Sequence, residues 1–161
     1  MRLIKDKIKS PYRLKSIILK LKRRKKTIAF TNGCFDILHY GHVAYLEKVK
    51  RLADVLVVAI NSDSSLRRIK GKGRPIVNLS NRLAVVAALE CVDFVTSFSQ
   101  DTPLELIKLI KPNFLVKGGD WYKDKIVGRK LVESYGGAVR TLPYIKGQST
   151  SKIIKQIAKA S

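Results

Sequence analysis

Short apolar segments alternate with helical periods along most of the chain, and this alternation constrains the fold more than any other feature. Segments of strand character occur at 27–31, 55–60, 94–98, 114–117 and 138–143, and helical spacing at 41–52, 80–90, 102–110, 124–135 and 150–160. Residues 55–60 are apolar throughout, as a strand covered on both faces requires. The order predicts an α/β fold, a Rossmann-like open parallel sheet of five strands with helices on both faces. The polar, basic stretch at 61–80 is predicted to be a loop with one short helix near 64–69.

A basic helical segment precedes the first strand. Ser10 and Pro11 are residue types preferred at the N-cap and first position of a helix. Apolar side chains then recur on one helical face at Leu14, Ile17, Ile18 and Leu21. We therefore expect residues 1–26 to form a helical segment that packs on a single domain of residues 27–161.

The charge of the chain is strongly positive. Its 33 Lys and Arg residues exceed its 12 Asp and Glu residues by 21, and half of this excess lies within residues 1–26. Such a field attracts nucleotides, nucleic acids and anionic lipid surfaces. Two interpretations of residues 1–26 remain open: a docked helix with a solvated basic end, which we favour, or an arm for a nucleic acid or membrane surface. A nucleic-acid-binding module is not favoured, because no helix-turn-helix signature or RNA-binding aromatic pair is present.

Several classes of protein are excluded by pattern. No apolar run approaches the roughly 18 residues of a membrane-spanning helix, and residues 1–15 lack the apolar core of a secretory signal. Cys34 and Cys91 are far apart and form no metal-binding or disulfide pattern, which favours a cytoplasmic protein. P-loop and dinucleotide-binding glycine motifs are also missing.

The most informative segment is ThrAsnGlyCysPheAspIleLeuHisTyrGlyHis at 31–42, directly after the first strand. It contains both histidines of the chain, His39 and His42, with Gly41 between them at the start of a helix. Two imidazoles and the free N–H groups of a helix start would converge on one point, which suits a phosphate. Gly33 would let the backbone approach a ligand closely. Capping and packing histidines are the alternative, but their concentration in this one turn favours a functional role.

Residues 33–42 resemble the first signature of the HxGH nucleotidyltransferase superfamily, and residues 147–151 (GlyGlnSerThrSer) resemble its second. Blocks at 61–63, 70–75, 81–82 and 116–120 follow the order of the heptose-1-phosphate adenylyltransferase branch, and the match runs from about residue 10 to the end. The resemblance implies a nucleotidyltransferase domain at 27–161. It implies transfer of AMP from ATP to D-glycero-β-D-manno-heptose 1-phosphate, giving ADP-heptose for lipopolysaccharide. The chain has no room for a sugar kinase domain and resembles the stand-alone form.

A related cytidylyltransferase is the main alternative. In glycerol-3-phosphate cytidylyltransferases the second signature begins with Arg-Thr, where this chain has Tyr144 and Ile145. This departure counts against that branch but does not by itself decide between adenine and cytosine.

The resemblance and the chemistry of phosphates assign roles to particular residues. Attack on the α-phosphorus of ATP depends mostly on positioning and electrostatic stabilisation. The predicted catalytic residues are His39, His42, Lys70 and Lys72. The predicted nucleotide-binding residues are Thr31, Asn32, Gly33, Phe35, Gly41, Arg82, Lys117, Ser149, Thr150 and Ser151. The predicted sugar-phosphate-binding residues are Asp63, Asp120 and Trp121.

Several of these residues also have purely structural interpretations. Asp63, Asp120 and the Ser149–Ser151 segment could serve only as caps, Trp121 only as a packing residue, and the two lysines only as part of a solvated loop. Gly71 and Gly73 nevertheless indicate a mobile lid around Lys72. Asp36 is expected to hold its loop by accepting backbone N–H groups. Arg82 begins a helix and needs an anionic partner there.

The cofactor and the assembly are predicted less fully. We expect Mg²⁺ to arrive with ATP, because no carboxylate cluster marks a metal site in the protein. ATP and a sugar 1-phosphate are the expected partners. The sequence leaves the oligomeric state open, a homodimer included.

Overall fold

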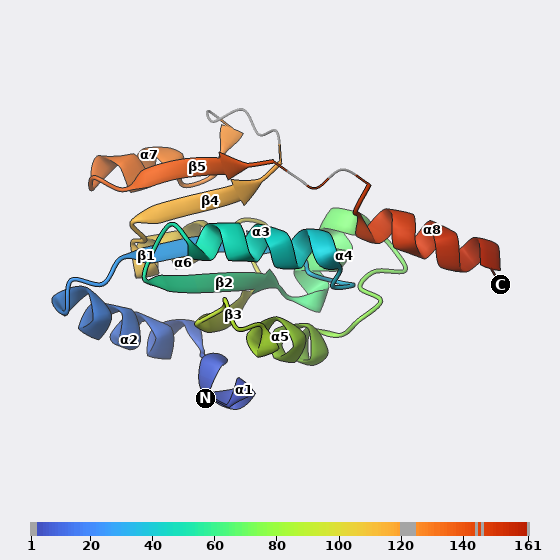
Figure 1. Cartoon of the computed structure of the whole chain (residues 1–161), viewed down its shortest axis with the longest axis horizontal. Helices are drawn as coiled ribbons and strands as arrows, with labels where there is room; N and C mark the ends of the chain where they lie inside the picture. Colours follow the sequence, from blue (N-terminus) through green and yellow to red (C-terminus); the bar gives the residue numbers. More distant parts are fainter. Residues whose placement is uncertain (1–2, 120–124, 144, 146, 161) are drawn as a thin grey trace.

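Five parallel strands form one sheet. The computed structural model describes residues 3–119, 125–143, 145 and 147–160. The strands are β1 (Ile28–Gly33), β2 (Val55–Asn61), β3 (Phe94–Phe98), β4 (Phe114–Gly118) and β5 (Ala138–Leu142). Their order in the sheet is β3-β2-β1-β4-β5, with every pairing parallel (Figure 1). The predicted five-stranded parallel α/β fold is thus confirmed.

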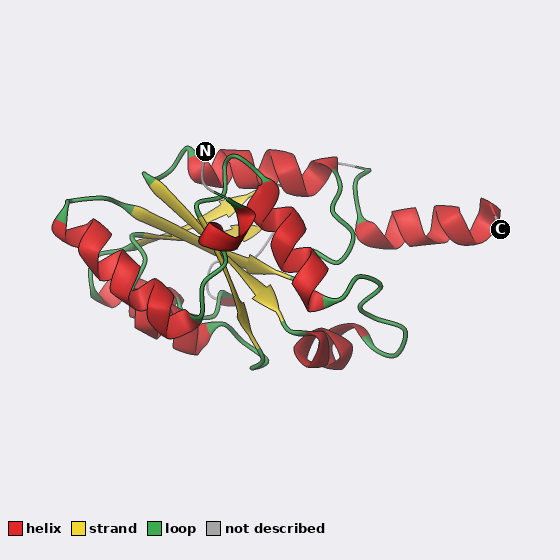
Figure 2. Cartoon of the chain, turned by 90° about the horizontal axis from the view of Figure 1, so that it is seen from below, coloured by secondary structure: helices red, strands yellow, loops and turns green. Residues whose placement is uncertain are grey.

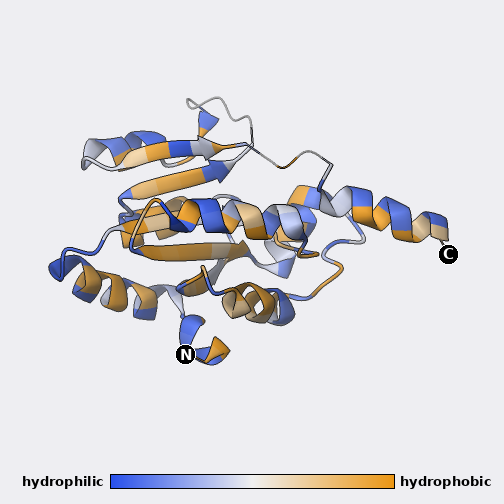
Figure 3. Ribbon diagram, viewed as in Figure 1, coloured by the Kyte–Doolittle hydropathy of each residue, from blue (hydrophilic) through white to orange (hydrophobic). Residues whose placement is uncertain are grey.

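Helices cover both faces of the sheet (Figure 2). They are α1 (Ile4–Lys7), α2 (Pro11–Arg23), α3 (Tyr40–Lys50), α4 (Asp63–Lys70), α5 (Leu79–Ala88), α6 (Leu104–Ile110), α7 (Arg129–Ser134) and α8 (Thr150–Ala160). Alternate side chains of β1 enter opposite cores: Phe30 packs with residues of α2, α6 and α7, whereas Ala29 packs with residues of α3 and α5. This alternation explains why the strands that are covered on both faces are so apolar (Figure 3).

The amphipathic stripe of α2 is part of the first core. Leu14 and Ile18 are buried, and Ile17 and Leu21 pack against the same cluster. The basic residues at 22–26 follow on the solvent side, as Lys25 and its neighbours are exposed. The sequence pattern of this helix therefore predicted its packing face correctly.

The N-terminal segment extends the sheet at its β3 edge, which the sequence pattern did not indicate. After the short helix α1, Ile8 forms an isolated parallel bridge with Val95 of β3, and the N–H of Lys9 donates to the Val95 carbonyl at 2.9 Å. This segment continues the sheet by one bridge beyond β3.

Two predicted helix starts are wrong. The helix expected from Thr102 begins at Leu104, with Pro103 at the N-cap position and no side-chain cap. The helix expected from 124 begins only at Arg129, because Gly128 adopts φ 88° and a β-carbon there would lie 2.7 Å from Ile107. Residues 120–124 lie outside the described part of the chain.

The order of the strands changes direction at β1, which creates a crevice at the carboxyl ends of the strands. The chain leaves β1 toward β2 on one side, and after β3 it crosses to β4 on the other side of β1. Ligands of such sheets bind beyond the carboxyl ends of the strands, at this change of direction. Among the described helices, none is long and apolar enough to cross a membrane.

Candidate active site

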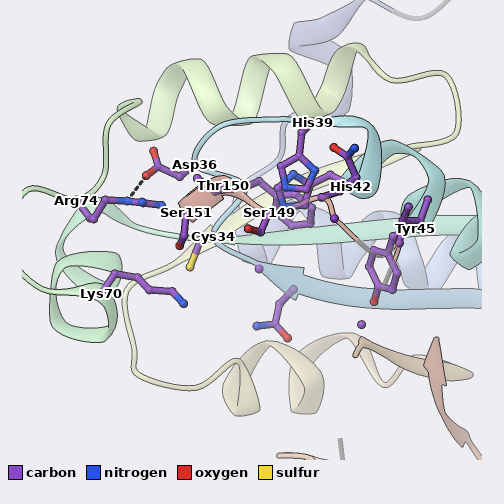
Figure 4. A pocket seen from close by; sticks show the side chains of 18 residues that line it. Cys34, Asp36, His39, His42, Tyr45, Lys70, Arg74, Ser149, Thr150 and Ser151 are labelled. Atoms are coloured by element: carbon purple, nitrogen blue, oxygen red, sulfur yellow. Dashed lines mark ion pairs between the residues drawn. The ribbon is translucent and has the colours of Figure 1, made fainter. Parts of the chain in front are cut away.

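A cavity of about 710 Å³ opens at the carboxyl end of β1 (Figure 4). Its volume is typical of sites for small ligands. Ten of the predicted site residues line it: Asn32, Gly33, Phe35, His39, Gly41, His42, Lys70, Ser149, Thr150 and Ser151. The first and second signature segments, more than 100 residues apart in the sequence, therefore meet at one site.

The two histidines are stacked in this cavity. His39 is the N-cap residue of α3, and His42 lies in its first turn. Their ring centroids are 3.9 Å apart and the rings are inclined by 28°. The ring of Phe35 packs against His42 at a centroid distance of 5.1 Å. Within the described part of the chain, the buried Nδ1 atoms of both histidines have no hydrogen-bond partner, which is uncommon for buried polar atoms.

Burial controls the charge of this pair. It lowers the pKa of His42 to about 4, and the neighbouring His39 adds to that shift. Burial also lowers the pKa of His39. Both imidazoles are therefore neutral at pH 7 in the free protein, and an anionic ligand would favour their protonated forms.

Close approach of the chain explains the glycines of the first signature. A β-carbon on Gly41 would lie 3.0 Å from the His39 ring and from Cβ of Gln148. A β-carbon on Gly33 would lie 2.9 Å from the ring of Phe35. Phe35 itself has φ 47°, in the left-handed region that such residues rarely adopt. The turn is thus held in an unusual conformation beside the histidines.

Asp36 fixes the other wall of the cavity. Its carboxylate is almost fully buried and accepts hydrogen bonds from the N–H groups of Ile76 and Val77 at 2.9 and 2.8 Å. It also pairs with Nε of Arg74 at 2.6 Å. Asp36 accepts backbone N–H groups as predicted, but they belong to the loop that follows α4 and not to its own turn.

The basic loop itself is only partly at the cavity. Lys70 lines it, whereas Lys72 is exposed and does not. Gly71 and Gly73 have φ values of 88° and 85°, with nothing within 4 Å of where a β-carbon would be. The predicted lid around Lys72 stays a prediction.

Arg82 and Asp63 form an ion pair with each other. Arg82 is 1% exposed and donates to the carbonyl oxygens of Val77 and Cys34 and, through Nη2 at 2.7 Å, to Asp63. The predicted anionic partner of Arg82 is thus Asp63. Neither residue lines the cavity, and the two join α4 to α5, so their predicted ligand contacts stay predictions.

Thr31 and Lys117 lie behind the lining residues. The Thr31 hydroxyl is buried and hydrogen-bonded to the Tyr45 hydroxyl at 2.8 Å. Lys117 donates to Oδ1 of Asn32, and burial lowers its pKa to about 8. In this structure both residues support a lining side chain instead of reaching the cavity themselves. Asp120 and Trp121 lie outside the described residues.

The start of α8 combines a helix cap with a wall of the cavity. Ser149 Oγ accepts from the Lys152 N–H at 3.2 Å, so this serine caps the helix. Thr150 Oγ1 lies 3.4 Å from the Ile37 carbonyl, tying the helix to the first signature. The same segment lines the cavity, so capping and ligand binding are compatible.

Further lining residues were missed by the sequence analysis. Tyr45 follows His42 by three positions, so the helical spacing could have placed it on the same face. Arg74 and Gln148 belong to the blocks that carried the resemblance, but no role was given to them. Cys34 also lines the cavity, and burial raises the pKa of its thiol.

The described residues offer few ligands for a metal ion. Within the described residues no group of three or more His, Cys, Asp or Glu side chains is placed to hold a metal ion. Among the described lining residues, Asp36 is the one carboxylate, and its oxygens are already engaged by Arg74 and two N–H groups. These residues do not form a dedicated magnesium site.

The histidine pair lies at the point where the strand order of a parallel sheet reverses, which is where ligands bind in such sheets and where the resemblance to nucleotidyltransferases places the phosphates. The chain belongs to the cytidylyltransferase-like family, whose model matches residues 30–156.

Relatives support this assignment over nearly the whole chain. The bifunctional protein HldE of Syntrophotalea carbinolica is 50% identical over 152 residues, which are 94% of this chain and 31% of the relative. The bifunctional protein HldE of Helicobacter hepaticus is 51% identical over 157 residues, 98% of this chain and 31% of the relative. The chain thus spans less than a third of the length of these relatives.

A solved structure supports the fold. The lipopolysaccharide core biosynthesis protein from Thermoplasma volcanium GSS1 superposes with a TM-score of 0.61 at 28% identity. The superposition covers 76% of this chain and 99% of the other.

Proposed function

We propose that the chain transfers AMP from ATP to D-glycero-β-D-manno-heptose 1-phosphate, giving ADP-heptose and pyrophosphate. An oxygen of the sugar phosphate forms a bond to the α-phosphorus of ATP. The bond from that phosphorus to the bridging oxygen breaks, and pyrophosphate leaves with the electron pair. The observation that carries this proposal is the stacked pair of His39 and His42, with unpartnered ring nitrogens, in a cavity at the end of β1.

The geometry gives each part of the cavity a task. His39 and His42 donate to phosphate oxygens and stabilise charge that develops around the α-phosphorus. The hydroxyl and N–H groups at Ser149–Ser151 bind phosphates of ATP at the start of α8. Lys70 and Lys72 add positive charge from the loop after α4.

The substrate and the metal are part of the same proposal. The order of the sequence blocks resembles the heptose-1-phosphate branch, which favours a heptose 1-phosphate as the acceptor. The names of the relatives, bifunctional protein HldE, agree with that branch. Asp120 and Trp121, which follow β4, are proposed to contact the sugar. Mg²⁺, when bound, neutralises phosphate charge; we propose that it enters with ATP. A cytoplasmic location is proposed because Cys34 and Cys91 are free thiols.

A pyrophosphate-release assay tests the substrate. The purified protein is given ATP or CTP with Mg²⁺ and a panel of sugar phosphates that includes glycerol 3-phosphate. We expect release with ATP and the heptose 1-phosphate. Release only with CTP and glycerol 3-phosphate would identify the cytidylyltransferase alternative, and no release with any heptose phosphate would overturn the proposal.

Truncation of either histidine tests the catalytic assignment. His39→Ala and His42→Ala should each lower kcat by about 100-fold or more while KM for ATP changes much less, because the donors act mainly in the transition state. Steady-state kinetics measure both constants. Tyr40→Ala is the matched control, since Tyr40 lies between the histidines but is 65% exposed and does not line the cavity. A histidine variant with full turnover would contradict the assignment.

A further inference from the structure

Arg74 is a cation of the cavity to which the reaction above gives no role. Its side chain is 17% exposed, and its Nε lies 2.6 Å from a carboxylate oxygen of Asp36 that is 1% exposed. Asp36 is itself held by two backbone N–H groups, so the negative charge beside the guanidinium has a fixed position, although the buried Nε makes no hydrogen bond of normal geometry with it. The described part of the chain pairs Arg74 with Asp36 alone, through Nε, so its two terminal nitrogens remain available. In Figure 4 the guanidinium extends from the loop into the cavity.

Lys70 is a second cation beside the same region. It ends α4 and lines the cavity, and in Figure 4 its amine points into the cavity from the same side as Arg74. Burial raises the pKa of the Cys34 thiol, and the charges of Lys70, Arg82 and Arg74 oppose this shift. The positive charges of Lys70 and Arg74 therefore both reach the region around Cys34, at the end of β1. Among the described lining residues, Asp36 is the one carboxylate.

The topology places these cations on one side of the histidine pair. Lys70 and Arg74 follow β2, which adjoins β1 on the side away from β4. Gly118, at the end of β4, lines the cavity from the other side. In a nucleotidyl transfer the attacking and leaving oxygens lie roughly in line on opposite sides of the phosphorus. With the α-phosphorus at the histidines, the β2 side and the β4 side thus receive different groups.

The leaving group is the better match for the β2 side. Pyrophosphate carries more negative charge than the phosphate of a sugar, and this side supplies two cations. The start of α8, with Ser151, also lines the cavity and adds N–H and hydroxyl donors there. A guanidinium fork matches the oxygens of a phosphate in a bidentate manner, which a solvated lysine does not.

We propose that Arg74 binds the departing pyrophosphate and that Asp36 acts through it as a positioning residue. This assignment rests on the proposed nucleotidyl transfer, but it concerns a ligand that can be tested without any sugar. The histidines then contact the reacting phosphate, and Arg74 contacts the group that leaves.

Direct binding of inorganic pyrophosphate with Mg²⁺ provides the test. Isothermal titration compares the unaltered protein with Arg74→Met, which keeps much of the side-chain length and removes the charged fork. Arg68→Met is the matched control, because Arg68 also pairs through Nε with a carboxylate, Asp101 at 2.8 Å, but is half exposed and outside the cavity. We expect Kd to rise about tenfold to a hundredfold for Arg74→Met and to stay nearly unchanged for Arg68→Met.

A second variant and a kinetic measurement separate binding from folding. Arg74→Lys keeps the charge but loses the fork, so its Kd for pyrophosphate should lie between that of the unaltered protein and that of Arg74→Met. Thermal melting confirms that each variant is folded. In the transfer reaction, Arg74→Met should weaken product inhibition by pyrophosphate while KM for the sugar phosphate is retained.

The outcomes distinguish the two proposals. Unchanged pyrophosphate affinity in a folded Arg74→Met protein, or a raised KM for the sugar phosphate with normal pyrophosphate inhibition, overturns the role of Arg74. Absence of pyrophosphate binding by the unaltered protein overturns it as well. If Arg74→Met loses pyrophosphate affinity while no heptose phosphate reacts, the role of Arg74 stands and the proposed substrate fails.

Discussion

Stacking of His39 on His42 depends on the absence of charge, because two imidazolium rings with centroids 3.9 Å apart would repel each other. Burial provides this condition by lowering the pKa of both rings. A bound anion would stabilise the protonated form of these rings, which burial disfavours in the free site. A pair of exposed histidines at the same spacing would lack this preparation.

The shifted pKa of His42 predicts a pH dependence of stability. The pKa is 6.5 in the unfolded chain and about 4 in the folded one, so between these values the unfolded chain binds more protons. Stability should therefore fall as pH decreases from about 6.5 toward 4, by about 2 kcal/mol for this ring after allowance for its partial exposure. Urea denaturation at pH 7 and pH 5 measures the loss. It should be smaller in His42→Asn, and an equal loss in that variant would contradict the assignment.

Gly41→Ala should separate catalysis from folding. Alanine favours helix over glycine by about 1 kcal/mol, so the first turn of α3 gains intrinsic stability. The new methyl group, however, would lie 3.0 Å from the His39 ring and from Gln148, and would displace them. We expect kcat to fall at least about tenfold while the melting temperature changes little. A variant with normal kcat would show that the ring position is not critical.

The strands could be predicted from sequence to within about two residues, because a strand buried on both faces is a continuous run of apolar residues. Helix starts were predicted less accurately, because the conformation of Gly128 delays α7. No sequence pattern marks the bridge of Ile8 with Val95. The predicted positions from β1 and the start of α3 reached the cavity, apart from Thr31, because neighbouring residues of one turn share a position. The Arg82–Asp63 pair joins two helices, and only the tertiary fold, which brings the first residue of α4 beside α5, determines it.

The helix α2 tests whether residues 1–26 fold with the rest. Ile18 is 1% exposed within the core shared by α2 and α6, so Ile18→Ala should lower the free energy of unfolding by about 2–4 kcal/mol. Leu19→Ala is the matched control, because Leu19 is 49% exposed on the same helix and its truncation should cost less than about 0.5 kcal/mol. Urea denaturation gives both values. Equal, small effects would mean that α2 is not part of the cooperative unit.

At the scale of the whole molecule, the net charge of +21 exceeds what one cavity can account for. Half of the excess lies in residues 1–26, which contribute no residue to the cavity lining. The catalytic cavity and the basic segment are therefore separate sources of positive potential. Both attract anions over a distance set by the ionic strength.

ATP affinity should consequently depend on salt. Raising KCl from about 20 to about 300 mM shortens the Debye length severalfold, so Kd for ATP should rise about tenfold while Kd for adenosine, which is uncharged, stays nearly constant. Titration calorimetry at several salt concentrations measures both. Replacing Lys22 through Lys26 by glutamine should reduce the salt dependence without abolishing ATP binding, since those residues do not line the cavity. A salt-independent Kd for ATP would show that the charge excess neither attracts nor binds the nucleotide. A gel shift of an oligonucleotide that weakens steeply with salt would instead support the nucleic-acid interpretation of the basic segment.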